Sequence, residues 1–537
     1  MSAPALAAAV LGIPSAGMAR IATLAPLLAP AELVVGAKAC GHARLSAVLA
    51  WGLKPSARRA ESLAQRRGLP LWRCEDGFLR SLALGPDAPP WSLLLDDLGI
   101  YYDAHAPSRL EQLITQPLDD AQHQRAAELR QLWCEQRLSK YNGARESPPP
   151  ASPYVLVVDQ TAGDLSISCG MADLHSFKRM LVAALNGHPH CRILLKSHPD
   201  VVAGRKRGCL GLAALQHPRV DLCADGGHPA ALLEAAEAVY VVTSQLGFEA
   251  LLWGRPVHCF GMPFYAGWGL TSDEWPPPPR RAAHCPSLEQ LVHAALIDYP
   301  RYLNPHSLQP CEPETLMRIV GLQRRRQAEL PPRVEAFGFK PWKQPILRRF
   351  LRGSQVRFRR RNAAVSASIP ALAIWGRDPG RGVAQRLRQA DPPALLRVED
   401  GFLRSVGLGA NLIAPLSWVV DRTGVYYDAT APSDLETFLR HHAFSEAERR
   451  RGAGLRQRLV AEALTKYNLP AVPWQRPADK PRVVLVPGQV ENDASIRHGA
   501  PGLSTNLQLL QAVRKAEPEA WIVYKPHPDV VAGLRRE

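Results

Sequence analysis

Two aspartates stand at the same distance ahead of a His-Pro pair in this 537-residue sequence. Asp164 and Asp493 are each followed by a lysine, a histidine and a proline: Lys196, His198 and Pro199 in the first set, and Lys525, His527 and Pro528 in the second. A carboxylate can serve as a nucleophile, a general base or a metal ligand. An imidazole can donate a hydrogen bond to a phosphate oxygen, and a lysine adds positive charge there. The spacing indicates chemistry at a phosphate-bearing substrate, with a helix cap and a turn-forming His-Pro-Asp as the structural alternatives.

A second pattern, at residues 243–249, follows an apolar stretch and is expected to open a helix. Backbone amides and hydroxyls at such a start, including the hydroxyl of Ser244, suit a nucleotide phosphate. Glu249, about one turn inside the helix, is a candidate acceptor for ribose hydroxyls. An ordinary N-terminal cap with an interior glutamate explains the same residues. The aromatic loop at residues 263–271 suits contact with a sugar or a base, or buried packing.

The stretch EDGFLRS occurs without change at residues 75–81 and 399–405. Its charged residues are Glu75, Asp76 and Arg80 in the first copy, and Glu399, Asp400 and Arg404 in the second. They follow a predicted strand and are expected either to bind an acceptor or to brace a cleft.

No duplicated set of metal ligands is visible. The adjacent pair Asp96-Asp97 becomes Asp421-Arg422 in the second copy, which disfavours a duplicated two-carboxylate site. The ten cysteines all lie within residues 40–311 and form no CxxC pair, so buried reduced thiols are expected. The sequence therefore predicts neither a metal nor a cofactor.

The chain contains an internal repeat. Besides EDGFLRS, the stretches GxYYDAxAPS (from 99 and 424), KYN (from 140 and 466) and KxHPDVVAG (from 196 and 525) recur in order, at offsets of 324–329. The first copy continues to about residue 302, whereas the second stops at Glu537. The second copy is therefore expected to be truncated by about a hundred residues.

Each copy alternates apolar strands with helical periodicity, which predicts an α/β fold. Strands are expected at residues 46–51, 71–74, 154–158, 191–195 and 238–242, and helices at 56–67, 174–186 and 229–237. Two doubly wound domains per module would place the site at the carboxyl ends of strands, in the cleft between the domains. The predicted domains are 1–150 and 151–322 for the first module, a basic linker at 323–365, and 366–478 and 479–537 for the second.

Composition excludes several classes of protein. Apolar residues make up 46% and charged residues 21%, which is not the balance of a disordered chain. No apolar stretch of 18 residues is free of charges or breakers, and the Ala-rich start lacks a basic n-region, so a cytoplasmic protein is expected.

The net charge of +16 is concentrated in one stretch. Residues 324–361 carry thirteen Lys and Arg against two acids, a net of +11. This stretch predicts either a solvated linker or contact with an anionic lipid surface. No nucleic-acid-binding motif accompanies the charge, so nucleic acid is not an expected partner.

These motifs together, with SQLGFEAL and PFYAGWGLT, resemble the KpsC/LipA-type capsular polysaccharide proteins of Gram-negative bacteria. The resemblance covers nearly the whole chain. It implies tandem GT-B-like modules that act as retaining β-Kdo glycosyltransferases with CMP-Kdo as donor. Carried over by motif, it implies that Asp164 and Asp493 are catalytic, and that the His-Pro elements bind the nucleotide.

The resemblance also implies partners and a location. The acceptor would be lyso-phosphatidylglycerol or a Kdo-bearing lipid, at the cytoplasmic face of the inner membrane, in contact with a capsule synthesis or export complex. Two alternatives remain open: a transferase for another nucleotide sugar, and a non-catalytic export or scaffold protein that grips anionic polysaccharide. The missing end of the second copy puts the activity of that module in doubt.

Overall fold

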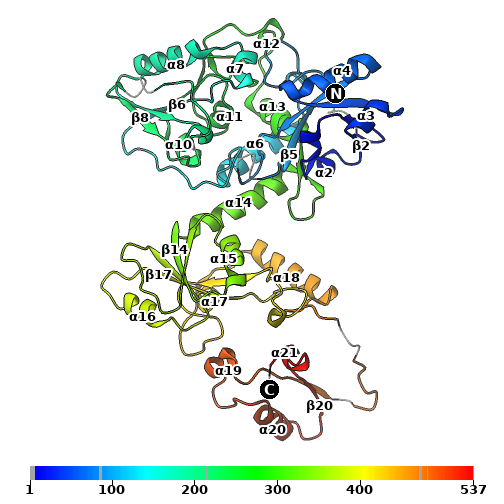
Figure 1. Cartoon of the computed structure of the whole chain (residues 1–537), viewed down its shortest axis with the longest axis vertical. Coiled ribbons are helices and arrows are strands. Elements are labelled where there is room, and N and C mark those ends of the chain that lie inside the picture. Colours follow the sequence, from blue (N-terminus) through cyan, green and yellow to red (C-terminus); the bar gives the residue numbers. More distant parts are fainter. Residues whose placement is uncertain are drawn as a thin grey trace. The chain divides into compact units, whose positions relative to one another are not determined.

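The computed structural model describes residues 6–83, 88–202, 204–211, 216–470, 474–480 and 482–535. The chain forms two compact units, residues 1–328 and 329–537, and each is described by itself (Figure 1). Each unit contains two sheets, and most of the strands in them are parallel. The predicted tandem α/β architecture is confirmed.

The first sheet of unit 1 has seven strands in the order β13-β12-β5-β4-β3-β1-β2. They are β1 (Val10–Ile13), β2 (Glu32–Val35), β3 (Ala47–Trp51), β4 (Leu71–Asp76), β5 (Ser92–Asp96), β12 (Pro300–Leu303) and β13 (Pro310–Cys311). Strands β1 to β4 are parallel, and β5, β12 and β13 add antiparallel pairs at one side. Residues 300–311 therefore belong to the first sheet, which corrects the prediction that all of residues 151–322 form the second domain.

The second sheet of unit 1 is parallel throughout, in the order β11-β10-β9-β6-β7-β8. Its strands are β6 (Tyr154–Val158), β7 (Arg192–Lys196), β8 (Val220–Cys223), β9 (Val239–Val241), β10 (Val257–Cys259) and β11 (Ser272–Asp273). The chain runs outward from β6 to β8, then crosses back to β9 on the other side of β6. This is the order of the dinucleotide-binding fold, whose ligand site lies where the strand order reverses.

Helices pack on these sheets because their apolar stripes need cover. Those of unit 1 with six or more residues are α4 (Arg58–Arg67), α5 (Arg109–Ile114), α6 (Asp120–Glu135), α8 (Leu174–Gly187), α10 (Ala230–Ala235), α11 (Gln245–Leu252), α13 (Leu288–His293) and α14 (Pro313–Glu329). Strand β6 is buried along its whole length, as a central parallel strand should be. The predicted strands and helices of this unit are confirmed, and their predicted ends lie within two residues of the observed ones.

Unit 2 repeats the first sheet of unit 1 in the order β15-β14-β16-β17-β18. These strands are β14 (Arg333–Phe337), β15 (Gln355–Arg359), β16 (Ala371–Trp375), β17 (Ala394–Asp400) and β18 (Trp418–Asp421), with helices α15 (Gln344–Phe350), α16 (Arg381–Leu387), α17 (Asp434–His441) and α18 (Glu446–Ala461). A two-stranded parallel sheet follows, formed by β19 (Val483–Pro487) and β20 (Trp521–Lys525) with α19 (Ala494–Gly499), α20 (Asn506–Ala516) and α21 (Pro528–Val531).

The basic stretch is folded, so the prediction of a linker at 323–365 is wrong. Strand β14 pairs with β16 along one side and with β15 along the other. Strands β14, β15 and β16 are the counterparts of β1, β2 and β3. Adding 324, the offset of the EDGFLRS repeat, to positions 10, 32 and 47 of the first copy gives positions 334, 356 and 371 of the second. The second copy thus begins some 40 residues earlier than predicted, at strands whose residue types have diverged. Strand β15 is an edge strand that carries arginines, and charged side chains on an edge strand disfavour pairing with other chains.

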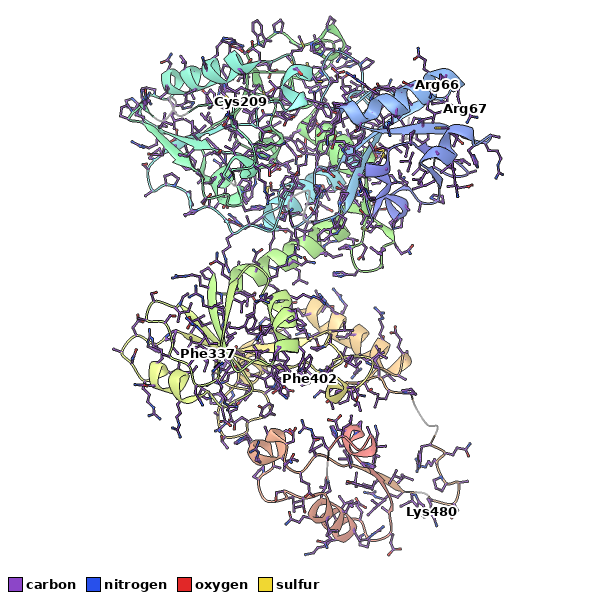
Figure 2. All side chains as sticks on the ribbon, in the orientation of Figure 1. Arg66, Arg67, Cys209, Phe337, Phe402 and Lys480 are labelled. Carbon is purple, nitrogen blue, oxygen red and sulfur yellow. The ribbon has the colours of Figure 1, made fainter. Side chains whose placement is uncertain are left out.

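One aromatic position shows how the two copies differ in cover. Phe78 is fully buried in unit 1, where its ring stacks on Phe264 at 4.6 Å and lies 5.9 Å from Phe248. Its counterpart Phe402 is 59% exposed and contacts Tyr426 (Figure 2). Within the described residues of unit 2, nothing equivalent to Phe264 covers it. Across the described part of the chain, no helix combines the length and apolarity that crossing a bilayer requires.

Candidate active site

Three predicted site residues follow three neighbouring strands of the second sheet in unit 1. Asp164 follows β6, His198 follows β7 and Ser244 follows β9. Because β9, β6 and β7 are adjacent and parallel, their carboxyl ends meet at one edge of the sheet. This edge includes the point of strand reversal, where α/β folds bind ligands.

Asp164 caps helix α7 (Leu165–Cys169) and keeps its carboxylate exposed. Its Oδ1 accepts a hydrogen bond of 3.0 Å from the amide of Ser166. Gln160 ties this loop to the next one, because its amide nitrogen donates to Ser166 Oγ at 3.3 Å and to Thr243 Oγ1 at 3.0 Å. The cap accounts for one lone pair of one oxygen, so the carboxylate stays available to a substrate.

The hydrogen bond to His198 fixes which of its ring nitrogens carries the proton. The amide of Asp200 donates to His198 Nδ1 at 3.1 Å, so Nδ1 is unprotonated and Nε2 carries the hydrogen of the neutral ring. Burial lowers the pKa of His198, while the carboxylates of Asp200 and Asp164 oppose that shift. A neutral imidazole with a free Nε2–H suits donation to a phosphate oxygen at neutral pH.

Two lysines place positive charge near His198, the exposed Lys206 and then Lys140, and neither is among the site residues predicted from the sequence. Each lies close enough to His198 to lower that residue's pKa. Burial alone would lower the pKa of Lys140, but neighbouring Tyr101 and Tyr141 and the carboxyls of Asp76 and Glu75 raise it overall. The signal was present in the repeat, since KYN recurs with Lys466 at the equivalent position.

Lys196 points elsewhere. It is 5% exposed, and its Nζ donates to the carbonyl of Gly227 at 2.9 Å, beside Asp225. The expectation that Lys196 and His198 act together is therefore not met in this structure. The side chain of Pro199 lies outside the described residues.

The residues of helix α11 that are predicted to bind a nucleotide contact other residues of this chain in the structure. Ser244 caps the helix by accepting from the amide of Leu246 at 3.3 Å. Glu249 is fully buried, and its Oε1 accepts from the amide of Lys140 at 3.2 Å, which braces the Lys140 segment instead of facing a ribose. The aromatic loop is buried too: the hydroxyl of Tyr265 approaches Gly247 so closely that an added Cβ would lie 2.2 Å away.

Burial raises the pKa of Glu249 to about 7, above its ordinary value of 4.5. A raised pKa means that stability is present below pH 4.5 and is lost as the pH rises through 7. Glu249→Gln removes this titration, so the variant should gain stability relative to the native chain by up to about 3 kcal/mol between pH 5 and pH 8. Denaturant unfolding at both pH values measures the difference. Glu234→Gln, on α10, is the control, and equal pH profiles for Glu249→Gln and the native chain would refute the assignment.

The charged turn braces the site and also contributes to it. The guanidinium of Arg80 pairs with Asp76 at 2.7 Å, and its backbone amide donates to the carbonyl of Lys140 at 3.0 Å. Burial raises the pKa of Glu75, which accepts from the indole of Trp51 at 3.0 Å. Arg80 is predicted either to bind an acceptor or to brace a cleft, and its contacts favour bracing. Glu75 and Asp76 lie beside Lys140.

Unit 2 repeats these contacts with its own residues. Asp493 caps α19, and His527 Nδ1 accepts from the amide of Asp529 at 3.1 Å. Burial lowers the pKa of His527, which has Asp493 and Lys466 among its charged neighbours. Arg404 pairs with Asp400 at 2.8 Å, burial raises the pKa of Glu399 to about 7, and Lys525 is exposed. In both copies, therefore, the histidine has the same tautomer and lies near the equivalent aspartate.

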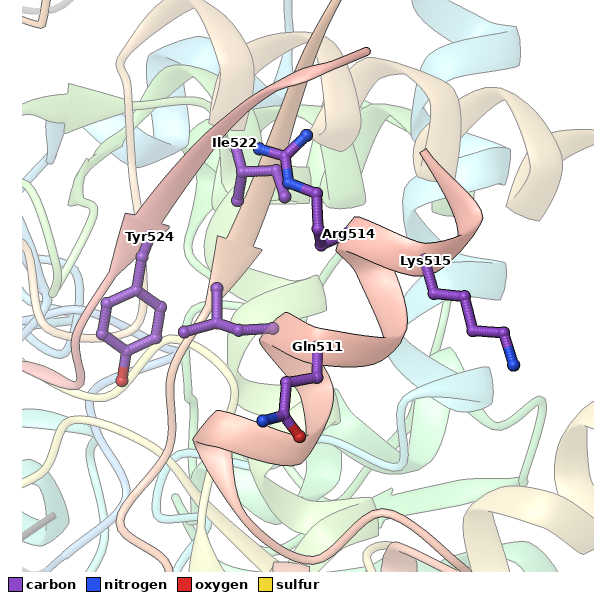
Figure 3. Close-up of a pocket in the computed structure, with 6 residues that line it drawn as sticks. Gln511, Arg514, Lys515, Ile522 and Tyr524 are labelled. Carbon is purple, nitrogen blue, oxygen red and sulfur yellow. The ribbon is translucent and has the colours of Figure 1, made fainter. Parts of the chain in front are cut away.

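A surface pocket in unit 2 lies apart from this arrangement. Helix α20 and strand β20 line it with Leu510, Gln511, Arg514, Lys515, Ile522 and Tyr524 (Figure 3). None of the predicted site residues contributes to it, and it contains no carboxylate or imidazole. This pocket is therefore not part of the candidate site at the strand ends.

Comparison with known proteins agrees with this geometry. The family described as "Capsule polysaccharide biosynthesis protein" matches residues 46–302, 370–472 and 440–537. The chain belongs to this family. It is 40% identical to the capsule polysaccharide modification protein LipA of Neisseria meningitidis serogroup A, over 97% of this chain and 76% of LipA. The predicted membership of the KpsC/LipA type is confirmed.

Two further comparisons are informative. The lipopolysaccharide-processing protein LpsZ of Rhizobium meliloti is 38% identical over 47% of this chain and 58% of LpsZ. The structure of Thermosulfurimonas dismutans KpsC, a beta Kdo 2,4 transferase, superposes with a TM-score of 0.54 at 38% identity, covering 58% of this chain and 97% of that one. This capsule protein thus shares its fold with a solved sugar transferase.

Proposed function

We propose that this capsule protein is a retaining β-Kdo transferase that uses CMP-Kdo as its donor. The observation that carries the proposal is the pair Asp164 and His198 at the reversal point of a dinucleotide-type sheet, repeated as Asp493 and His527. Family membership and the likeness to a Kdo transferase support the choice of sugar.

Retention follows from two successive displacements. In the first, an Asp164 carboxylate oxygen bonds to the anomeric carbon of Kdo while the bond from that carbon to the CMP oxygen breaks, and CMP departs with the electron pair. In the second, the oxygen of an acceptor hydroxyl bonds to the same carbon and releases its proton to solvent, while the bond from that carbon to Asp164 breaks and the aspartate leaves as a carboxylate. Each displacement inverts the centre, so the product keeps the configuration of the donor.

The departing phosphate needs donors and positive charge. His198 offers Nε2–H to a phosphate oxygen because Nδ1 is already occupied by the amide of Asp200. Lys206 and Lys140, rather than Lys196, supply the nearby positive charge. Fixed donors of this kind stabilise developing negative charge without reorganisation, and they do so with side chains of this chain alone.

A donor screen tests the proposed function. The full chain is incubated with CMP-Kdo or UDP-sugars and either lyso-phosphatidylglycerol or a Kdo-bearing lipid, and released nucleotide and product mass are measured. We expect CMP release coupled to addition of Kdo to a lipid acceptor. Turnover with UDP-sugars alone would indicate the other transferase class, and no turnover with any donor would support a scaffold role.

We also propose that the basic stretch binds an anionic membrane surface peripherally. Arg348, Arg349 and Arg352 lie exposed on and just after α15, and none forms an ion pair with another described residue. Each basic residue near such a surface contributes about 1 kcal/mol. Replacing all three by serine should therefore weaken binding to phosphatidylglycerol liposomes roughly 100-fold at low salt.

Co-sedimentation at increasing salt measures this binding. Three arginines on α18, Arg449, Arg450 and Arg451, are also exposed and provide the control triple substitution, with the difference that Arg450 pairs with Glu446 at 2.8 Å. A specific role for the α15 arginines would be contradicted if binding did not depend on the salt concentration. It would also be contradicted if both triple variants reduced binding equally.

A further inference from the structure

A mixed cluster of metal-binding side chains lies in unit 1, away from the site described above. One donor atom each from His188, Cys191 and Glu237 lies within 4.8 Å of the other two. Cys191 immediately precedes β7 and Glu237 lies two residues before β9, so the cluster is at the amino ends of strands whose carboxyl ends hold His198 and Ser244. The two sites are therefore at opposite edges of one sheet.

The backbone around these three residues is held in place. Arg219 donates to the carbonyl of His188 at 2.7 Å, to that of Cys191 at 3.2 Å, and to that of Leu185 in helix α8. The amide of Cys191 donates to the carbonyl of His188 at 3.2 Å, which closes the turn between them. Glu237 is fixed separately, because its amide donates to the carbonyl of Tyr154 at the start of β6.

The donor set fits a borderline-soft divalent ion. A thiolate, an imidazole and a carboxylate are all ligands of Zn²⁺, whereas Mg²⁺ and Ca²⁺ prefer oxygen alone. Tetrahedral zinc with its usual bond lengths places a sulfur and an oxygen ligand about 3.5 Å apart. Cys191 Sγ and Glu237 Oε2 are 3.2 Å apart.

We propose that His188, Cys191 and Glu237 form a site for Zn²⁺ or a chemically similar divalent ion. Binding displaces the thiol proton of Cys191 to solvent, and the thiolate and carboxylate together balance the charge of the ion. Three protein ligands leave a fourth position for water. The ion would clip the end of α8 to the start of β9 and so stabilise this sheet rather than take part in transfer.

Two neighbouring features define the competing explanation. Burial and Glu237 raise the pKa of Cys191 overall, and the positive charge of the Arg219 guanidinium beside the cluster only partly opposes that rise. The contact between Cys191 and Glu237 is also the distance of an S–H···O hydrogen bond. A protonated thiol bonded to the carboxylate, with no ion, is thus the alternative that an experiment must separate.

Cobalt substitution separates them on the full chain. Metal-free protein is titrated with Co²⁺, and a thiolate-to-cobalt charge-transfer band is expected at one equivalent. Cys191→Ser should abolish the band, whereas Cys285→Ser, at an exposed cysteine in the same unit, should retain it. Glu237→Gln keeps the thiol and should weaken Zn²⁺ binding on the order of 10- to 100-fold in competition with a chromogenic chelator.

A thermal measurement provides a second readout. Zn²⁺ should raise the unfolding temperature of the native chain and of Cys285→Ser, but not that of Cys191→Ser. Absence of the charge-transfer band in the native chain, or a band that survives Cys191→Ser, would overturn the proposal. Equal Zn²⁺ affinity in the native chain and Glu237→Gln would also contradict it.

Discussion

Asp164→Asn should reduce transfer by the first copy by about three orders of magnitude or more, because an amide cannot replace the attacking carboxylate. The fold should be unaffected, since asparagine caps helices about as well as aspartate and residue 164 is exposed. The assay is Kdo transfer in an Asp493→Asn background, so that only the first copy can act. The reciprocal variant isolates the second copy in the same way.

Asp173 provides the matched control for this experiment. It also caps a helix, α8, and its carboxylate accepts from the amide of Ser176 at 2.9 Å. Asp173→Asn should leave transfer unchanged within twofold or so. Near-native turnover in Asp164→Asn, or an equal loss in Asp173→Asn, would show that Asp164 acts only as a cap.

His198→Ala should produce the second-largest effect. Removing one preorganised donor to a developing charge typically costs about 10²- to 10³-fold in turnover. We also expect the affinity for CMP, measured by calorimetry, to fall roughly tenfold. Lys140→Met should weaken CMP binding as well, whereas Lys196→Met should not, because the Lys196 ammonium is bound to the carbonyl of Gly227.

The chain contains a close control for His198. His217 also precedes a proline, and its Nδ1 accepts from an amide two residues later, at 3.2 Å, but it is exposed and lies just before β8. His217→Ala should leave both CMP affinity and turnover unchanged. If His198→Ala behaved in the same way as His217→Ala, His198 would have only a turn-forming role.

The repeat in the sequence predicts that the two copies share local structure, because identical stretches meet the same local constraints. EDGFLRS forms the same ion pair and the same backbone contact to a KYN segment in both copies. The three strand-to-helix loops that hold Asp164, His198 and Ser244 were also predictable, since buried parallel strands have a recognisable apolar pattern. Their meeting at one sheet edge follows from strand order, which the sequence does not state.

The sequence prediction differs from the structure at positions where the type of a residue does not reveal its structural role. Strands β14 and β15 are absent from the sequence prediction because Glu335 in β14 and arginines in β15 interrupt the apolar pattern. The expected contact of Glu249 with a ribose rests on its place in a helix, whereas the structure buries its side chain completely and bonds it to the amide of Lys140. Lys140 was overlooked because its importance arises from tertiary neighbours, Asp76 and Glu75 among them.

Trapping the sugar on the protein tests the central claim most directly. The full chain is incubated with CMP-Kdo in the absence of acceptor, quenched in acid, digested and analysed by peptide mass spectrometry. We expect the mass of one Kdo on the peptide that contains Asp164, lost in Asp164→Asn and removed when acceptor is added before quenching. Transfer of Kdo to acceptor with the label on another residue, or with the label retained in Asp164→Asn, would contradict the proposed nucleophile.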